Sequence, residues 1–323
     1  MRGARGILFV FFLGLAGCHL NAERRPAPPS TLEREAVRRK PRVEPPSMWQ
    51  RVITPVAGTS AGMTVSIEDQ ETKLMLYLPA GWEREEKLKR VLTVHFHGAP
   101  WFIIQEHERR KSKHPLLCVH LGEGSSVYQR AFQDCGRWPQ LVKKIERELA
   151  SRSGAYSLSG VEVSSFSAGY GAVRELLLCN DSFRQISRIV LADSMYASVQ
   201  TNSAGNREVS TEQIEVWVPF AQAAMAGGKT FVFSRSEVPT TSFASSSECA
   251  AALLIKLAIT SEPADPALAA TRDPDFPLQT IAHCGQFFLW GYAGTNAAAH
   301  LTHVRHLADV WQALDAMERP SGK

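Results

Sequence analysis

The cysteines of this sequence form no metal or redox motif. Beyond Cys18, five stand singly along the chain, and no two are separated by only two residues: Cys118, Cys135, Cys179, Cys249 and Cys284. A zinc ribbon or a thioredoxin-type site requires closely spaced cysteine pairs, so neither is indicated. Spacing alone cannot pair the five, and we expect most of them to be small buried side chains.

A basic excess is missing from the part of the chain that is expected to fold. The formal net charge is +4, but residues 1–17 contribute +2 and residues 18–47 contribute +3, which leaves −1 for residues 48–323. Domains that bind nucleic acid usually carry their basic excess on the folded part. The charge distribution therefore excludes nucleic acid as a partner.

The apolar run near the N-terminus, Ile7–Leu15, is too short to cross a bilayer comfortably. Two arginines precede it and two small residues follow it, which is the order of a secretory signal. The sequence Leu15-Ala16-Gly17-Cys18 resembles a bacterial lipobox, in which the cysteine becomes the lipidated first residue of the mature protein. We therefore expect a lipoprotein signal peptide over residues 1–17, and an exported protein that the lipid on Cys18 anchors to a bacterial membrane at the cell envelope.

Residues 18–47 contain six prolines, many charged residues and few apolar ones. Such a stretch cannot bury enough surface to order itself, so it is expected to be a disordered tether between membrane and domain. Its basic surplus also suits an anionic lipid surface. Residues 48–323 show no internal repeat and are expected to form one domain.

Short apolar runs alternate with helix-like stretches from about residue 60 onward. Met63–Ile67 and Lys73–Leu78 suggest a hairpin, and further strands are expected at 91–96, 116–121, 161–166, 186–192, 230–233 and 287–290. Helices are expected at 137–149, 168–178, 213–224, 246–257 and 297–317. This alternation predicts an α/β fold with a mostly parallel central sheet, helices on both faces, and an insertion after the strand that ends at Asp193.

The strongest chemical signal is Ser165-Phe166-Ser167-Ala168-Gly169, where a strand turns sharply into a helix. It resembles the G-x-S-x-G nucleophile elbow of the α/β-hydrolase superfamily, with Ser165 in place of the first glycine. The residues two positions either side of the serine must be small, because strand and helix approach closely there. The resemblance implies Ser167 as nucleophile and the Ala168 N–H, at a helix N-terminus, as an oxyanion donor.

The segment His95-Phe96-His97-Gly98-Ala99 resembles the His-Gly segment after the third strand of this superfamily. The resemblance implies a second oxyanion donor near Ala99. His95 and His97 would share a face of a strand, a spacing that also suits a metal. No third ligand is placed to complete such a site, so we expect no metal.

The same resemblance places the catalytic base after the last strand. His300 follows the glycine-rich loop at 291–296 and is the first candidate, with His303 as the alternative. The acid is expected at Asp193, which directly ends an apolar strand, with Glu237 after the following strand as the alternative.

The order Ser167, acid, His300 matches the superfamily over roughly residues 60–318. The resemblance implies a serine hydrolase that cleaves an ester, less readily an amide. The reaction would pass through an acyl-enzyme and need no cofactor. An acyltransferase with the same residues and a non-catalytic hydrolase-fold lipoprotein remain alternatives. Trp217, Phe220 and Met225 in the insertion are candidates for an acyl pocket or for ordinary packing, and Trp101 and Phe102 for another wall.

Overall fold

The computed structural model describes residues 62–317 except 71, 85, 88–89 and 266–272. The predicted lipobox, the lipidation site Cys18, the predicted tether and the first part of the predicted domain lie outside these residues. Within the described part of the chain, no helix is both long and apolar enough to cross a membrane.

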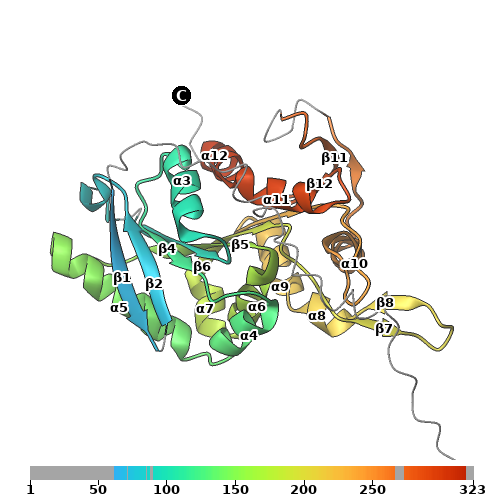
Figure 1. Cartoon of the computed structure of the whole chain (residues 1–323), viewed down its shortest axis with the longest axis horizontal. Helices are drawn as coiled ribbons and strands as arrows, with labels where there is room; N and C mark the ends of the chain where they lie inside the picture. The colour runs from blue at the N-terminus through green and yellow to red at the C-terminus, as the bar shows by residue number, and fades with distance from the viewer. Residues whose placement is uncertain (1–61, 71, 85, 88–89, 266–272, 318–323) are drawn as a thin grey trace, which may run out of the picture. The chain divides into compact units, whose positions relative to one another are not determined.

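A ten-stranded sheet in the order β1-β2-β4-β3-β5-β6-β9-β12-β11-β10 forms the centre of the described chain (Figure 1). The strands are β1 (Met63–Asp69), β2 (Thr72–Leu78), β3 (Val91–Phe96), β4 (Leu116–Val119), β5 (Gly160–Phe166), β6 (Ile186–Ala192), β9 (Thr230–Arg235), β10 (Glu262–Pro263), β11 (Leu278–Cys284) and β12 (Phe287–Tyr292). The run from β4 to β12 is parallel, and β1, β2, β11 and β10 pair antiparallel at its two ends. The predicted α/β fold with a mostly parallel central sheet is confirmed.

Helices cover both faces of the sheet, with α3 and α12 on one side and α5, α6 and α7 on the other (Figure 1). The helices are α3 (Pro100–Arg110), α4 (Ser125–Phe132), α5 (Arg137–Ser153), α6 (Tyr170–Leu178), α7 (Asn180–Gln185), α8 (Thr211–Glu215), α9 (Val218–Met225), α10 (Ser246–Leu257), α11 (Ala297–Arg305) and α12 (Leu307–Met317). Short 3₁₀ turns are η1 (Trp82–Arg84) and η3 (Ser167–Gly169), and the insertion after β6 begins with a hairpin of β7 (Val199–Thr201) and β8 (Arg207–Val209).

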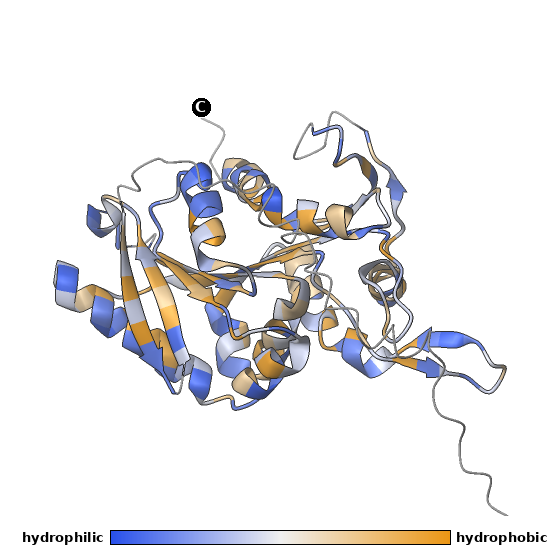
Figure 2. Cartoon of the chain, in the orientation of Figure 1, coloured by the Kyte–Doolittle hydropathy of each residue, from blue (hydrophilic) through white to orange (hydrophobic). Residues whose placement is uncertain are grey.

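The two faces of the central strands differ in character. The α5 side is the main apolar core, where Val94, Val163 and Leu191 are buried and belong to one cluster with Leu141 and Ile145 of α5. Figure 2 shows these apolar central strands in orange. Because side chains alternate along a strand, the residues between these apolar ones face α3 and α12, and several of them are polar or charged.

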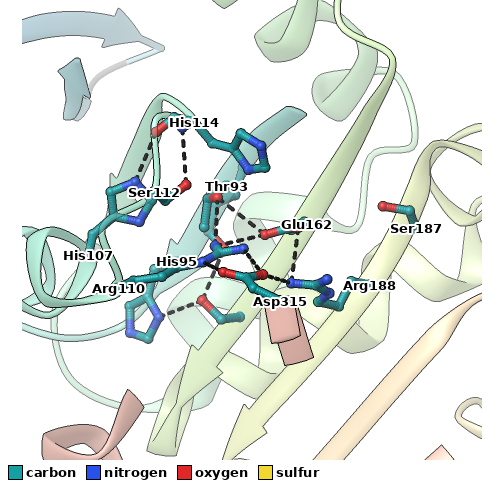
Figure 3. Close-up of polar contacts among 12 residues, drawn as sticks. Thr93, His95, His107, Arg110, Ser112, His114, Glu162, Ser187, Arg188 and Asp315 are labelled. Carbon is teal, nitrogen blue, oxygen red and sulfur yellow. Dashed lines mark hydrogen bonds and ion pairs between the residues drawn. The ribbon is translucent and has the colours of Figure 1, made fainter. Parts of the chain in front are cut away.

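A buried ion cluster joins α12 to this polar face (Figure 3). Arg110 of α3 lies 2.8 Å from Glu162 of β5 and 2.7 Å from Asp315 of α12, while Arg188 of β6 lies 3.2 Å from Glu162 and 2.9 Å from Asp315. Burial alone would raise the pKa of Glu162, but the two guanidinium groups outweigh it and hold that pKa well below its usual range. The cluster therefore fixes the C-terminal helix against the sheet.

Two long predicted helices are each interrupted. The helix predicted over 297–317 is divided at His306 into α11 and α12. The helix predicted over 213–224 is divided into α8 and α9, because Pro219 lacks the N–H that an interior helical residue donates and so begins a new helix. Helices α3, α4 and α7, the β7–β8 hairpin and the strands β10 and β11 were not predicted from the sequence, although Pro100 in the first turn of α3 is a start signal.

Cys135 and Cys179 form a disulfide, with their Cα atoms 5.5 Å apart. It links the loop before α5 to the junction of α6 and α7. Cys118 and Cys249 are free and buried, as expected, and Cys284 is free and half-buried.

Candidate active site

Ser167 lies in a tight turn between β5 and α6 and has a φ of +48°. This left-handed conformation is uncommon for a residue with a side chain and marks a strained position. The turn is also crowded, since a Cβ added to Gly169 would lie 2.3 Å from the carbonyl oxygen of Phe96 at the end of β3. The small residue two positions after Ser167 is thus required by the packing of the turn on β3.

Ser165, the residue that stands in place of the motif's first glycine, is fully buried. Its hydroxyl oxygen lies 2.8 Å from that of Ser194, and Ser194 donates to the carbonyl oxygen of Ser167 at 2.8 Å. The fold therefore accommodates the Ser165 side chain, because its hydroxyl has a hydrogen-bond partner in Ser194. A glycine at this position would have no side chain to make that contact.

Asp193 lies at the end of β6, is fully buried and has a φ of +45°. Its Oδ1 accepts from the Ser236 N–H at 2.9 Å and from the Ser246 hydroxyl, and its Oδ2 accepts from the Ser236 hydroxyl at 2.6 Å. The Nδ1 atom of His300 lies 2.6 Å from Oδ2. Burial alone would raise the pKa of Asp193, but His303, His300 and these hydrogen bonds outweigh it and hold the pKa well below its usual range.

His300 lies near the start of α11, whose N-cap is Asn296. The Asn296 side chain accepts from the Ala299 N–H at 3.0 Å and fixes this first turn. The His300 ring stacks on Phe166 with their centroids 4.5 Å apart, and Phe166 directly precedes Ser167. With Nδ1 engaged by Asp193 and the side chain 21% exposed, the imidazole lies beside the serine turn and stays partly open to solvent.

His303, the alternative base, lies inside the protein. Its Nδ1 atom is 2.8 Å from the Ser234 hydroxyl, and its ring packs against Phe276 and Tyr292. Burial lowers the pKa of His303 to about 4. The structure thus brings His300, and not His303, into contact with Asp193.

Glu237, the alternative acid, pairs with Arg235 at 3.2 Å and has a side chain that is 42% exposed. Its backbone N–H donates to the Gly294 carbonyl at 3.0 Å. Of the two candidate carboxylates, Asp193 is the one bonded to His300.

Ala168 and Ala99 lie on two backbone segments that meet at the serine turn. Ala168 is in the first turn of the η3–α6 run, where N–H groups have no partner within the helix. Ala99 precedes Pro100 as the N-cap of α3, and its carbonyl accepts from Phe102 at 2.9 Å. The contact of Gly169 with the end of β3 brings the two segments together.

His95 and His97 do not share a face, because His97 leaves the strand with a φ of +66°. The Nδ1 and Nε2 atoms of His95 lie 2.8 Å from the Ser164 hydroxyl and 3.0 Å from the His97 carbonyl. The Nδ1 atom of His97 lies 3.0 Å from the hydroxyl of Tyr128. Among the residues that the structure describes, no group of three or more side chains is placed to hold a metal ion.

Of the two alternatives for Trp217 and Phe220, an acyl pocket or ordinary packing, the structure supports packing. Both are fully buried, and both rings pack against Phe231 in the core. Phe102 is also buried, whereas Trp101, two residues after Ala99, is 45% exposed. The insertion therefore contributes packing through α9, and any contact it makes with a substrate must come from other residues.

Sequence reasoning missed Ser236 and Ser246, the two serines that hold Asp193. Ser236 follows β9 directly, as Asp193 follows β6, and the two strands are neighbours in the sheet. The strand order could have indicated Ser236, because the carboxyl ends of neighbouring parallel strands lie at one edge. Ser246 belongs to α10, and we find no feature of the sequence that indicates its contact with Asp193.

No protein-family profile matches the sequence, and no curated protein is significantly similar to it. Solved structures with a similar fold include the poly(3-hydroxybutyrate) depolymerase LpqC from Bordetella parapertussis, with a TM-score of 0.43 and 13% identity over 78% of this chain and 90% of that one. An α/β-hydrolase enzyme from the metagenome of Lake Arreo, Spain, has a TM-score of 0.44 and 12% identity over 91% and 93%. The ferric enterobactin esterase from Salmonella typhimurium has a TM-score of 0.42 and 13% identity over 82% and 61%. At such identities we transfer no residue role or substrate to this chain.

Proposed function

We propose that this protein is a serine hydrolase that cleaves a carboxylic ester through an acyl-enzyme on Ser167. The observation that carries the proposal is the 2.6 Å contact between Asp193 and His300, beside the strained turn that presents Ser167. An ionised Asp193 accepts the Nδ1 proton of His300, which leaves Nε2 as the nitrogen that accepts a proton. A base oriented in this way is what activates a serine hydroxyl.

In the proposed reaction, the Ser167 oxygen attacks the ester carbonyl carbon while His300 takes the hydroxyl proton. The negative charge on the carbonyl oxygen is stabilised by the Ala168 and Ala99 N–H groups. The intermediate collapses as His300 gives its proton to the departing alcohol, which leaves an acyl group on Ser167. Water then attacks the acyl group by the same route, and no cofactor takes part.

Labelling with a fluorophosphonate probe tests this proposal. The full chain, purified in detergent, should become labelled on Ser167, and a panel of esters with graded acyl lengths should reveal a substrate. Ser167→Ala should abolish the label and lower turnover about 10⁴-fold. Ser151→Ala, at an exposed position of α5, is the matched control and should behave as wild type. Full ester hydrolysis by Ser167→Ala would reject the assignment.

We further propose that the hydrolase acts at the cell envelope, with residues 1–17 removed as signal peptide, residues 18–47 as tether and the domain of 48–323 held by a lipid on Cys18. The Cys135–Cys179 disulfide supports export, because disulfides persist in oxidising compartments. Cys18→Ser should move the protein from the membrane fraction to the soluble fraction. If that variant stays in the membrane fraction, the lipid anchor is rejected.

A further inference from the structure

Three aromatic rings form a continuous row that begins beside the proposed active site. Tyr170 and Tyr196 have their ring centroids 5.6 Å apart, and Tyr196 meets Phe243 edge to face at 5.4 Å. The rings come from three separate segments, namely the first turn of α6, the loop after β6 and the loop after β9. The row is therefore a product of the tertiary structure, and no periodicity in the sequence reveals it.

The inner end of the row is tied to the residues of the site. Tyr170 lies three residues after Ser167, and Tyr196 lies three residues after Asp193. The Tyr196 hydroxyl donates to the Asp193 carbonyl oxygen at 3.1 Å. Both residues are half-buried, so each keeps some exposed surface.

The outer end of the row is an exposed ring on a firmly held loop. Phe243 is 42% exposed. The guanidinium of Arg207, from strand β8 of the insertion, donates to the carbonyl oxygens of Thr240 at 3.2 Å, Thr241 at 2.6 Å and Phe243. The same group pairs with Glu248 at the start of α10 at 3.0 Å.

A second contact holds the same loop on its other side. The Ala244 N–H donates to the Ala197 carbonyl at 2.7 Å, one residue after each of the two rings that meet. A single exposed aromatic residue needs no explanation. An exposed ring whose backbone is fixed on both sides, in line with two rings that lead to a nucleophile, is preorganised for a contact.

We propose that Tyr170, Tyr196 and Phe243 form a subsite for an aryl group of the ester substrate, with Arg207 of the insertion as the residue that positions Phe243. This inference rests on the proposed hydrolase function. Aromatic rings bind other rings in offset and edge-to-face arrangements, and each such contact contributes roughly 2- to 10-fold to affinity beyond the area buried. The guanidinium of Arg174 lies 5.7 Å from the Tyr170 ring centre and is already engaged by Gln213 and Glu175. The guanidinium of Arg207 is engaged by Glu248 and the loop carbonyls, so the row is suited to a neutral ring.

The test compares aryl and alkyl esters of matched length on the full chain in detergent. One pair places the ring on the acyl side, ethyl 3-phenylpropanoate against ethyl hexanoate, and the other on the alcohol side, 3-phenylpropyl acetate against hexyl acetate. In one of the two pairs the wild type should favour the aryl ester in kcat/KM. Phe243→Ala and Phe243→Leu should each lower that aryl-to-alkyl ratio about 5- to 10-fold, because leucine restores the apolar contact without the ring. Ile255→Ala, at an exposed apolar position of α10, is the control and should leave the ratio unchanged.

Binding of 3-phenylpropan-1-ol and hexan-1-ol, followed by NMR titration of wild type and Phe243→Ala, supplies a readout that needs no catalysis. If Ser167 takes the fluorophosphonate label but neither Phe243 variant changes the ester ratio, the aryl subsite is overturned and the hydrolase proposal stands. If Ser167 does not take the label, the hydrolase proposal fails, and the NMR binding measurement alone tests the aryl subsite. Weaker binding of the aryl alcohol to Phe243→Ala would then support the subsite, and equal binding would overturn it.

Discussion

The hydroxyl oxygens of Ser165 and Ser194 lie 2.8 Å apart beneath the Ser167 turn. Each hydroxyl carries one hydrogen. Because Ser194 donates its hydrogen to the Ser167 carbonyl, Ser165 must donate to Ser194. The two hydroxyls form a short directed series of hydrogen bonds that ends on the Ser167 carbonyl. This series explains how the protein tolerates serine at position 165, where the elbow motif has glycine.

Ser194→Ala should therefore weaken the turn more than Ser165→Ala does. The alanine at position 194 leaves the buried Ser165 hydroxyl without its acceptor and the Ser167 carbonyl without its donor, at a cost of about 1–3 kcal/mol in unfolding free energy. The rate of fluorophosphonate labelling should fall in parallel. Urea denaturation and labelling of both single variants and the double variant measure these effects. Strictly additive effects would contradict the hydrogen-bond series from Ser165 through Ser194 to Ser167.

Substitution of the two candidate acids should have different effects on kcat. Asp193→Asn should lower kcat about 10⁴-fold, because an amide no longer stabilises the His300 tautomer that accepts the serine proton. Glu237→Gln should leave kcat within about twofold, since Glu237 pairs with Arg235 near the surface. Steady-state kinetics on any ester that the wild type cleaves decides between them, and a reversed order of the two effects would move the acid to Glu237.

Buried histidines should make the folded state sensitive to mild acid. Burial lowers the pKa of His95 and His107 to about 3 and of His303 to about 4, against an ordinary value of 6.5. The unfolded chain therefore binds more protons between about pH 6.5 and pH 4, so stability contributed by these groups is lost as pH falls through this window. His306 acts in the opposite direction, because Asp309 and Asp273 outweigh its burial and raise its pKa.

Urea denaturation at intervals from pH 7.5 to pH 4.5 should show unfolding free energy falling with acidity. His303→Gln should reduce that fall by on the order of 2 kcal/mol, whereas His306→Gln should not reduce it, because the pKa of His306 is raised. A pH-independent unfolding free energy would show that these three imidazoles are not held neutral.

Asp315→Asn should break the charge balance of the cluster in Figure 3. The two buried guanidinium groups would then share one carboxylate, Glu162, in place of two, and removing one partner from a buried ion cluster costs about 3 kcal/mol. The control is Glu148→Gln, in a more exposed pair with Arg152, which should cost less than about 1 kcal/mol. Equal effects of the two substitutions in urea denaturation would show that the cluster does not hold α12.

The disulfide should be present in protein purified without reductant and should support the fold. Reduction, or replacement of Cys135 and Cys179 by serine, should lower the unfolding free energy by about 4 kcal/mol, because the bond closes a loop across a separation of 44 residues. Peptide mapping without reductant checks the link. Alkylation of both thiols in the native protein before any reduction would contradict it.

The sequence by itself determined the central parallel strands and the position of the tight turn at Ser167. Runs such as Val91–Phe96 and Ile186–Ala192 are strands with the predicted bounds, because continuous apolar runs of this length bury only as central strands. A small residue at position 169 was also predicted from the motif, although the Phe96 carbonyl that crowds it belongs to the neighbouring strand β3.

Only the tertiary structure decided which side chains meet. Asp193 and His300 are 107 residues apart in the chain, and their contact depends on where α11 docks on the sheet, which no local pattern encodes. Long-range packing likewise buries Trp217 in the core and aligns Phe243 with Tyr196. Sequence patterns report which face of an element is apolar, whereas the partner of each polar group depends on strand order and helix docking, and these are properties of the whole fold.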